Sequence, residues 1–169
     1  ELINKNNIIG WFQGKMEFGP RALGNRSIIC DPCDKKLKDI LNIDIKHREP
    51  WRPLAPSILI EDMNKWFEPR HESPFMILSF DVKEEKRKEI PGVVHVDNSA
   101  RVQTVHKETN PRYYKILKSL KKIKNIPIVL NTSFNDTEPI VMSPQNALKT
   151  FFATGIDYLS IGNYIVRKK

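Results

Sequence analysis

The stretch Gly14–Ser27 (GKMEFGPRALGNRS) follows an apolar run, Ile8–Phe12, that has the composition of a buried strand. It holds three glycines, and glycine lets the backbone adopt positive φ and approach a ligand closely. We expect Pro20 to begin a short helix, Pro20–Leu23, that Gly24 ends. Backbone N–H groups at a helix start, together with arginines, can hold a phosphate or a carboxylate. A tight turn with solvated arginines fits equally well, because this is neither a Walker A sequence nor a dinucleotide fingerprint.

The length of the chain, 169 residues, indicates one domain with a sizeable core, and we treat residues 1–169 as that domain. With 40% hydrophobic and 28% charged residues, the composition is that of a globular protein in water. The sequence shows no apolar run long enough to cross a membrane and no signal peptide, so we expect a cytoplasmic protein with no membrane partner. The chain passes almost directly from Glu1 into a strand, which suggests a fragment of a longer polypeptide.

The net charge of +8 indicates an anionic partner, which is a nucleic acid, a phosphorylated small molecule or an acidic protein surface. Several lysines between residues 115 and 124 lie on one predicted helix and its end, where by default they form a solvated face. Other cations lie beside glycine, proline, aromatic or small residues, a setting typical of groups that point into a cleft. These are Arg21, Arg26, Lys46, Arg52 and Arg101.

Hydrophobic periodicity and turn residues predict an α/β domain with a twisted, mixed sheet flanked by helices. The expected strands are Asn7–Gln13, Ser27–Cys30, Leu54–Ile60, Pro74–Val82, Val93–Val96, Ala100–Val105, Ile126–Leu130, Ile156–Ile161 and Tyr164–Arg167. The expected helices are Asp34–Asn42, Asp62–Phe67, Asn110–Ile123 and Ser143–Thr154, with Asp34, Asn110 and Ser143 as N-caps.

A second candidate stretch is Lys46–Pro53 (KHREPWRP), in which two prolines stiffen a segment that carries Lys46 and Arg52. A stiff backbone lowers the entropic cost of holding a cation against an anion. The alternative is a plain surface loop. In a third stretch, Asn98–Val105, Arg101 precedes an alternating strand, so its side chain has one definite face.

The fourth candidate stretch is Leu130–Asn135 (LNTSFN), where an apolar strand ends in amide and hydroxyl side chains. Ligands of open α/β sheets lie at the carboxyl ends of strands, so Asn131 and Ser133 could bind phosphate oxygens or an amide group. An ordinary Asx or Ser/Thr turn is the alternative. Met76 is most simply a core residue. Because no Ser-His-Asp set or close carboxylate pair is evident, an enzyme here would act by positioning and charge neutralisation around phosphates.

One C-x-x-C pair, Cys30 and Cys33 in CDPC, has no second cysteine pair to complete a zinc site. We favour two reduced thiols and predict no metal site and no permanently bound cofactor. Arg26 is expected to pair with an acidic neighbour. For Lys15 the sequence favours neither a solvent-exposed position nor a place in the site.

Five blocks of sequence, in order, resemble the C-terminal domain of the O-carbamoyltransferase family, which includes the nodulation-factor, cephamycin and tobramycin carbamoyltransferases. The blocks are GWFQGKMEFGPRALGNRSI, KHREPWRPLAPSI, SARVQTV, LNTSFN and PIVMSPQNAL. The resemblance implies a YrdC-like domain that makes carbamoyl-adenylate from carbamoyl phosphate and ATP. It also implies a separate N-terminal domain, related to Kae1, that transfers the carbamoyl group to an acceptor hydroxyl and that these residues do not include.

The resemblance further implies which residues form the site. Lys46, Arg52, Arg101, Asn131 and Ser133 would hold carbamoyl phosphate and the nucleotide phosphates, with Lys46, Arg52, Arg101 and Ser133 as the catalytic set. Arg21 would line the same pocket, and Met76 would line its nucleotide side. ATP would arrive with Mg²⁺ as a substrate. The family pattern more often has other residues in place of the two cysteines.

A basic RNA-binding module of YrdC-like fold is the competing hypothesis, since the net charge is positive. Such a module is expected to stack bases on exposed aromatic side chains. The aromatic residues do not alternate with the arginines, so nucleic acid is the less favoured partner.

Overall fold

The computed structural model describes residues 1–69 and 71–168. The strands are β1 (Ile9–Phe12), β2 (Arg26–Cys30), β3 (Ala55–Leu59), β4 (Ser79–Asp81), β5 (Ser99–Arg101), β6 (Gln103–Val105), β7 (Ile128–Ser133), β8 (Tyr158–Ile161) and β9 (Tyr164–Arg167). The α-helices are α1 (Lys35–Ile40), α2 (Met63–Trp66), α3 (Pro111–Lys124) and α4 (Pro144–Ala153). Short helical turns are η1 (Ile3–Lys5), η2 (Leu41–Ile45), η3 (Ile60–Asp62) and η4 (Glu84–Lys86).

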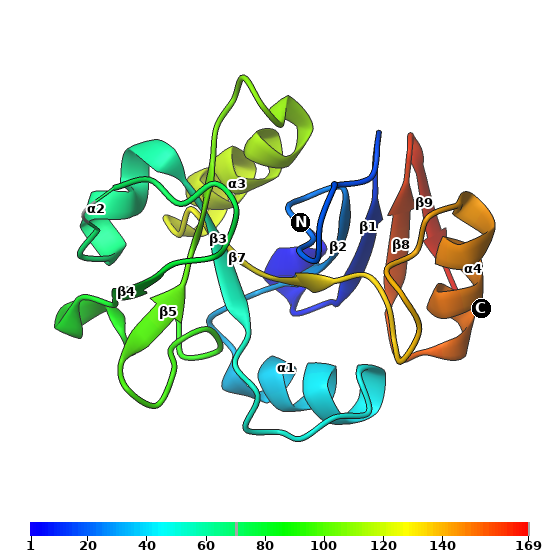
Figure 1. The fold of residues 1–169 in the computed structure, drawn as a ribbon, viewed down its shortest axis with the longest axis horizontal. Coiled ribbons are helices and arrows are strands. Elements are labelled where there is room, and N and C mark those ends of the chain that lie inside the picture. Colours follow the sequence, from blue (N-terminus) through cyan, green and yellow to red (C-terminus); the bar gives the residue numbers. More distant parts are fainter. Residues whose placement is uncertain (70, 169) are drawn as a thin grey trace.

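A mixed sheet in the order β6-β3-β7-β2-β1-β8-β9 forms the centre of the molecule, and β4 and β5 form a second small sheet. Within the large sheet, β1 and β8 run parallel, as do β3 and β6, and the other neighbours are antiparallel. Helix α3 contacts β3 and β7, and α4 contacts β1 and β8. Figure 1 shows α1 and α3 on opposite sides of the sheet, with α4 beside β8. The predicted α/β architecture with a mixed sheet is confirmed.

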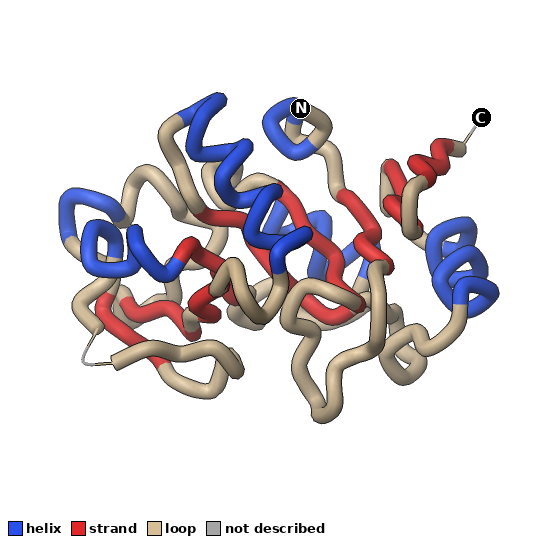
Figure 2. The backbone as a smooth tube through the Cα atoms, turned by 90° about the horizontal axis from the view of Figure 1, so that it is seen from above, coloured by secondary structure: helices blue, strands red, loops and turns tan. Residues whose placement is uncertain are grey.

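The sheet is buried on both faces because neighbouring residues of its central strands enter different cores. Ile28 and Leu130 belong to the core that α1 and α4 cover, whereas Ile29 and Val129 belong to the core that α3 covers. Side chains alternate across a strand, so each central strand must be apolar on both sides. The long loops gather on the side opposite the N-terminus in Figure 2. None of the helices in the described ranges has the length and apolar character needed to cross a membrane.

Local signals predicted the helices well. Asp34, Asn110 and Ser143 are N-caps whose side chains accept from backbone N–H groups, and Ser143 forms a capping box with Asn146. The helix predicted from Asp34 continues past Ile40 as a π-helical turn, η2.

Three predicted strands are wrong or too long. Val93–Val96 is a turn. Pro74–Val82 contributes only β4, because Met76 has φ 55 and interrupts the extended backbone. Ala100–Val105 divides into β5 and β6, which pair with different strands, β4 and β3. An alternating sequence predicts extended backbone but does not identify the partner strand.

The helix predicted at Pro20–Leu23 is also wrong, since this segment is irregular. The Glu17 side chain takes the N–H groups that a helix would use: its Oε1 accepts from Leu23 N and Asn25 N, each at 2.7 Å. Gly24 follows with φ +108, and a Cβ there would lie 2.3 Å from the Tyr113 ring. The segment is therefore a loop closed by Glu17 and packed against α3.

Candidate functional site

Two neighbouring cavities bring together the residues that the sequence singles out. The smaller, about 80 Å³ and here called the arginine cavity, is lined by Arg21, Arg48, Met76, Arg101, Asn131 and Ser133 together with Pro20, Ala22, Pro53, Leu54, Ala55 and Thr132. The larger, about 820 Å³ and here called the lysine cavity, is lined by Lys46, Arg48, Arg52 and Ser133 together with Ile43, His47, Glu49, Asn135 and Asp136. Arg48 and Ser133 line both cavities, so the two lie next to each other.

Three arginines, Arg21, Arg48 and Arg101, converge on the arginine cavity. None of them is in an ion pair with a carboxylate of residues 1–69 or 71–168. Burial lowers the pKa of Arg101, and the like charges of Arg21 and Arg48 lower it further. Half-buried cations that face one another without a counter-ion are the arrangement expected of a site that binds an anion.

Arg48 is the site residue that the sequence interpretation missed, although it stands between Lys46 and Arg52 in KHREPWR. Its Nε donates to Asn42 Oδ1 at 2.8 Å. The Nδ2 of Asn42 in turn donates to the carbonyl oxygens of Pro50 and Arg52, at 3.1 and 3.0 Å. Asn42 is fully buried. It therefore fixes both the shape of the segment and the direction of the Arg48 guanidinium, which a sequence pattern does not reveal.

Lys46 lies in the lysine cavity with its ammonium group already surrounded by oxygens. Its Nζ donates to Ser133 O at 2.5 Å, to Asn135 O at 2.8 Å and to Asn135 Oδ1 at 2.7 Å. Burial lowers the pKa of Lys46 to about 7, with a further contribution from the positive charge of Arg48. Ser133 Oγ donates to Asn135 Oδ1 at 2.7 Å. Lys46 thus holds the loop after β7 in place.

Asn131 lies in a buried polar cluster under the Pro20–Leu23 loop. Its Nδ2 is 3.0 Å from Ala22 O, from Ser57 Oγ and from Gln103 Oε1. Gln103 Nε2 donates to Leu23 O at 2.8 Å, and Ser57 Oγ donates to Gln103 Oε1 at 2.6 Å. The cluster spans β6, β3 and β7 and holds the loop that carries Arg21. Ser57 and Gln103 join this cluster only because β3 and β6 pair in the sheet. The sequence analysis therefore did not identify them as site residues.

Arg52 and Met76 lie at different depths in the site. Arg52 is about half exposed and its Nε is 2.7 Å from Glu49 Oε2, so it belongs to the rim of the lysine cavity. Met76 is 3% exposed and lines the arginine cavity.

Among residues 1–69 and 71–168, Arg26 has no ion pair with an acidic residue, contrary to the expectation from the sequence. Its guanidinium donates to the carbonyl oxygens of Gln13, Gly14 and Asn25 and lies 3.6 Å from the centre of the Phe12 ring. Backbone carbonyls at the two ends of the glycine-rich turn take the place of a carboxylate. Arg26 is therefore a structural residue of the opening loop.

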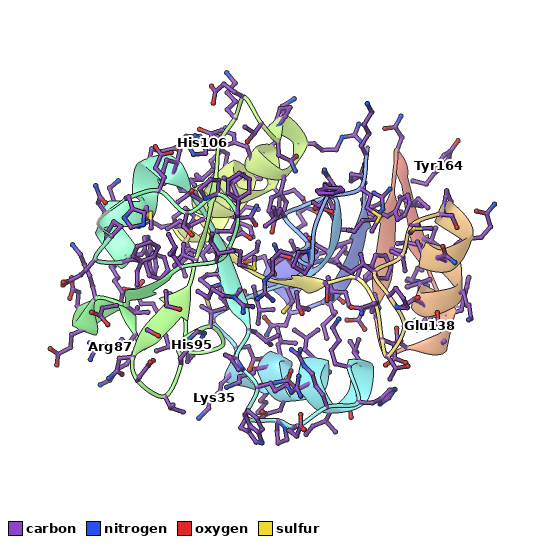
Figure 3. The ribbon with its side chains drawn as sticks, viewed as in Figure 1. Lys35, Arg87, His95, His106, Glu138 and Tyr164 are labelled. Atoms are coloured by element: carbon purple, nitrogen blue, oxygen red, sulfur yellow. The ribbon has the colours of Figure 1, made fainter. Side chains whose placement is uncertain are left out.

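The cysteines and histidines lie outside the two cavities, apart from His47. Cys30 and Cys33 are free, and burial raises the pKa of Cys33 to about 12, so its thiol stays protonated near neutral pH. The labelled His95 and His106 lie well apart in Figure 3. The described residues contain no group of three or more histidine, cysteine, aspartate or glutamate side chains that could hold a metal ion.

Sequence comparison places the chain in a family. Residues 1–168 match the model of the carbamoyltransferase C-terminus, and the chain belongs to that family. It is 47% identical over 173 residues to nodulation protein NolNO of Sinorhizobium fredii, covering all of this chain and 25% of that protein. It is 40% identical over 128 residues to the 3'-hydroxymethylcephem-O-carbamoyltransferase of Amycolatopsis lactamdurans, covering 76% of this chain and 24% of that protein. The resemblance to the O-carbamoyltransferase C-terminal domain is thereby confirmed.

A third relative, which carries the name of an uncharacterized protein, is also similar to this chain. Protein sll1178 of Synechocystis is 44% identical over 188 residues, covering 99% of this chain and 31% of that protein. The chain thus spans about a quarter to a third of the length of these relatives.

Proposed function

We propose that this domain binds carbamoyl phosphate and ATP, that water cleaves carbamoyl phosphate to carbamate and inorganic phosphate, and that the carbamate oxygen then attacks the α-phosphorus of ATP to form carbamoyl-adenylate and release pyrophosphate. The convergence of Arg21, Arg48 and Arg101 on one cavity, without carboxylate partners among the described residues, supports the proposal most directly. Carbamoyl phosphate and ATP are polyanions, and their reaction needs charge neutralisation and alignment more than a covalent nucleophile.

The sizes of the two cavities suggest which substrate binds in each of them. The arginine cavity is the smaller of the two and suits the smaller substrate, carbamoyl phosphate. The lysine cavity is roughly ten times larger and suits the nucleotide phosphates. Glu49 and Asp136 line it and could approach the Mg²⁺ that accompanies ATP as substrate.

The remaining steps are assigned to other parts of a larger enzyme. In this proposal a separate N-terminal domain, related to Kae1, transfers the carbamoyl group to an acceptor hydroxyl in the cytoplasm. The names of the relatives, a nodulation protein and a cephem O-carbamoyltransferase, support the class of reaction. No observation favours the RNA-binding alternative.

The test is pyrophosphate release from MgATP, measured with and without carbamoyl phosphate. We expect release that requires both substrates, and a large loss in the Arg101→Met variant. No carbamoylated acceptor should form with this domain alone. Thermal stabilisation by a short RNA, with none by carbamoyl phosphate or ATP, would contradict the proposal.

A further inference from the structure

The turn η1, near the N-terminus, has the geometry of a helix end. Asn7 N donates to Leu2 O at 3.3 Å, and the intervening Asn6 has φ 60. Asn6 N donates to Ile3 O at 3.0 Å. These two bonds around a left-handed residue form the Schellman motif, which ends α-helices. At the other end of the turn, Leu2 is already helical, with φ −58 and ψ −47, and no side chain caps it. The described residues thus contain the end of a helix without its start.

An apolar groove of about 410 Å³ lies between α3, η1 and the strands β1, β8 and β9. Helix α3 contacts β3 and β7, and in Figure 1 it lies well to the left of β8 and β9. The lining of the groove is mainly apolar and includes Leu2, Ile3, Ile9, Trp11, Ile123 and Ile165. Ile123 is 47% exposed and Ile165 is 58% exposed. A contiguous apolar surface of this kind is typical of a place where another apolar element packs.

Two exposed cations of α3, Arg112 and Lys115, also line the groove. Within residues 1–69 and 71–168, Lys115 makes no ion pair. Charge complementarity therefore favours an occupant with acidic residues on the flank that faces α3. The groove shares no lining residue with the arginine cavity or the lysine cavity, so its occupant is a different one from the substrates of the proposed reaction.

We propose that the groove holds an amphipathic helix formed by the residues that precede Glu1 in a longer polypeptide, and that η1 is the last turn of this helix. The relatives are long enough to contain such a helix, since this chain spans about a quarter to a third of their length. Leu2 and Ile3 line the groove, and residues three positions apart share one face of a helix. The two residues immediately before Glu1 should therefore be apolar. Whatever reaction the cavities carry out, the helix fastens the rest of the longer protein to a surface that shares no residue with them.

The test is hydrogen exchange in the complete longer polypeptide, compared between the wild type and its Ile165→Glu variant. We expect slow exchange in the turns before Glu1, and exchange there about tenfold or more faster in Ile165→Glu, because the docked helix would bury the new carboxylate. Val96→Glu is the matched control and should keep the wild-type exchange, since Val96 is fully exposed and lies outside the groove. In the chain that begins at Glu1, Ile165→Glu should move the Tm by less than about 3 °C, because Ile165 is exposed there.

Fast exchange before Glu1 in the wild type, or equal exchange in the wild type and a folded Ile165→Glu variant, overturns the docked helix. A proline or a charged residue at either of the two positions before Glu1 overturns it as well. A complete polypeptide that dimerises, and that Ile165→Glu makes monomeric in sedimentation, would assign the groove to a second copy instead. Should Ile165→Glu fail to fold, the wild-type exchange and the sequence before Glu1 still decide. Failure to bind carbamoyl phosphate would contradict the proposed function and leave the helix standing.

Discussion

Replacing Arg101 with methionine is expected to weaken anion binding and, at the same time, to stabilise the empty protein. Methionine retains an apolar chain of similar length and removes the guanidinium. Arg101 Nε is buried without a partner among the described residues. Burial lowers the pKa of Arg101, and the like charges of Arg21 and Arg48 lower it further, so its surroundings disfavour the charged form. Removal of the guanidinium should raise the free energy of unfolding by about 0.5–2 kcal/mol, the gain typical of replacing an unfavourable functional group.

The loss of binding should be larger than that gain. A hydrogen bond to a charged group contributes about 1.5–3 kcal/mol, so Arg101→Met should raise the Kd for carbamoyl phosphate about 10- to 150-fold. Arg52→Met is the matched control. Arg52 is half exposed and paired with Glu49, and such surface pairs contribute about 1 kcal/mol or less, so the Kd should change about fivefold or less.

Calorimetric titration and scanning calorimetry on the same preparations measure both effects. For a chain of this size, each kcal/mol of stability moves the Tm by about 2–4 °C. An Arg101→Met protein with a lower Tm and wild-type affinity would refute the reasoning on both counts. A larger binding loss in Arg52→Met than in Arg101→Met would move the anion site to the rim of the lysine cavity.

Two further predictions concern the opening loop and the proton balance of the site. Gly24→Ala should destabilise the protein by about 2–5 kcal/mol, because it adds a Cβ 2.3 Å from the Tyr113 ring at φ +108. Gly19→Ala at φ +122, with open space around it, should lose clearly less in the same urea titrations, and equal losses would contradict the packing argument. Lys46, whose pKa burial and Arg48 lower to about 7, is mostly neutral at pH 8. A bound dianion raises that pKa, so binding should take up a proton, measured from titrations in buffers of different ionisation enthalpy. Lys46→Met should abolish the uptake, and unchanged uptake would assign the proton to another group.

The helices could be predicted because their signals are local. Asn110 with Pro111, and Ser143 with Pro144, mark helix starts through groups that lie within one turn. The central strands β1, β2 and β3 are buried along their whole length, and they were also found. Strand partners are not local, so the division of Ala100–Val105 between two sheets was missed.

The cations of the site could be located in sequence, but their environments could not. The sequence places Lys46 and Arg52 in one stiff segment and does not distinguish them. In the structure Lys46 is 6% exposed and holds the loop after β7, whereas Arg52 is paired at the rim. Arg48 was missed because its direction depends on Asn42, which is fixed by two carbonyls further along the chain. The helix expected at Pro20–Leu23 does not form, because the Glu17 carboxylate accepts the hydrogen bonds of Leu23 N and Asn25 N that helical carbonyls would otherwise accept.

The polar cluster of Asn131, Ser57 and Gln103 explains how the opening loop holds Arg21 close to two other positive charges. These are Arg48 and Arg101. Arg21 is carried by a loop that would relax away from Arg101 if only apolar contacts held it, since apolar contacts are not directional. Hydrogen bonds to Ala22 O and Leu23 O fix the loop backbone directly after Arg21. Such clusters contribute little net stability compared with an apolar core, but when every bond is made they favour one arrangement. The same cluster thus positions Arg21 opposite Arg48 and Arg101 in the arginine cavity.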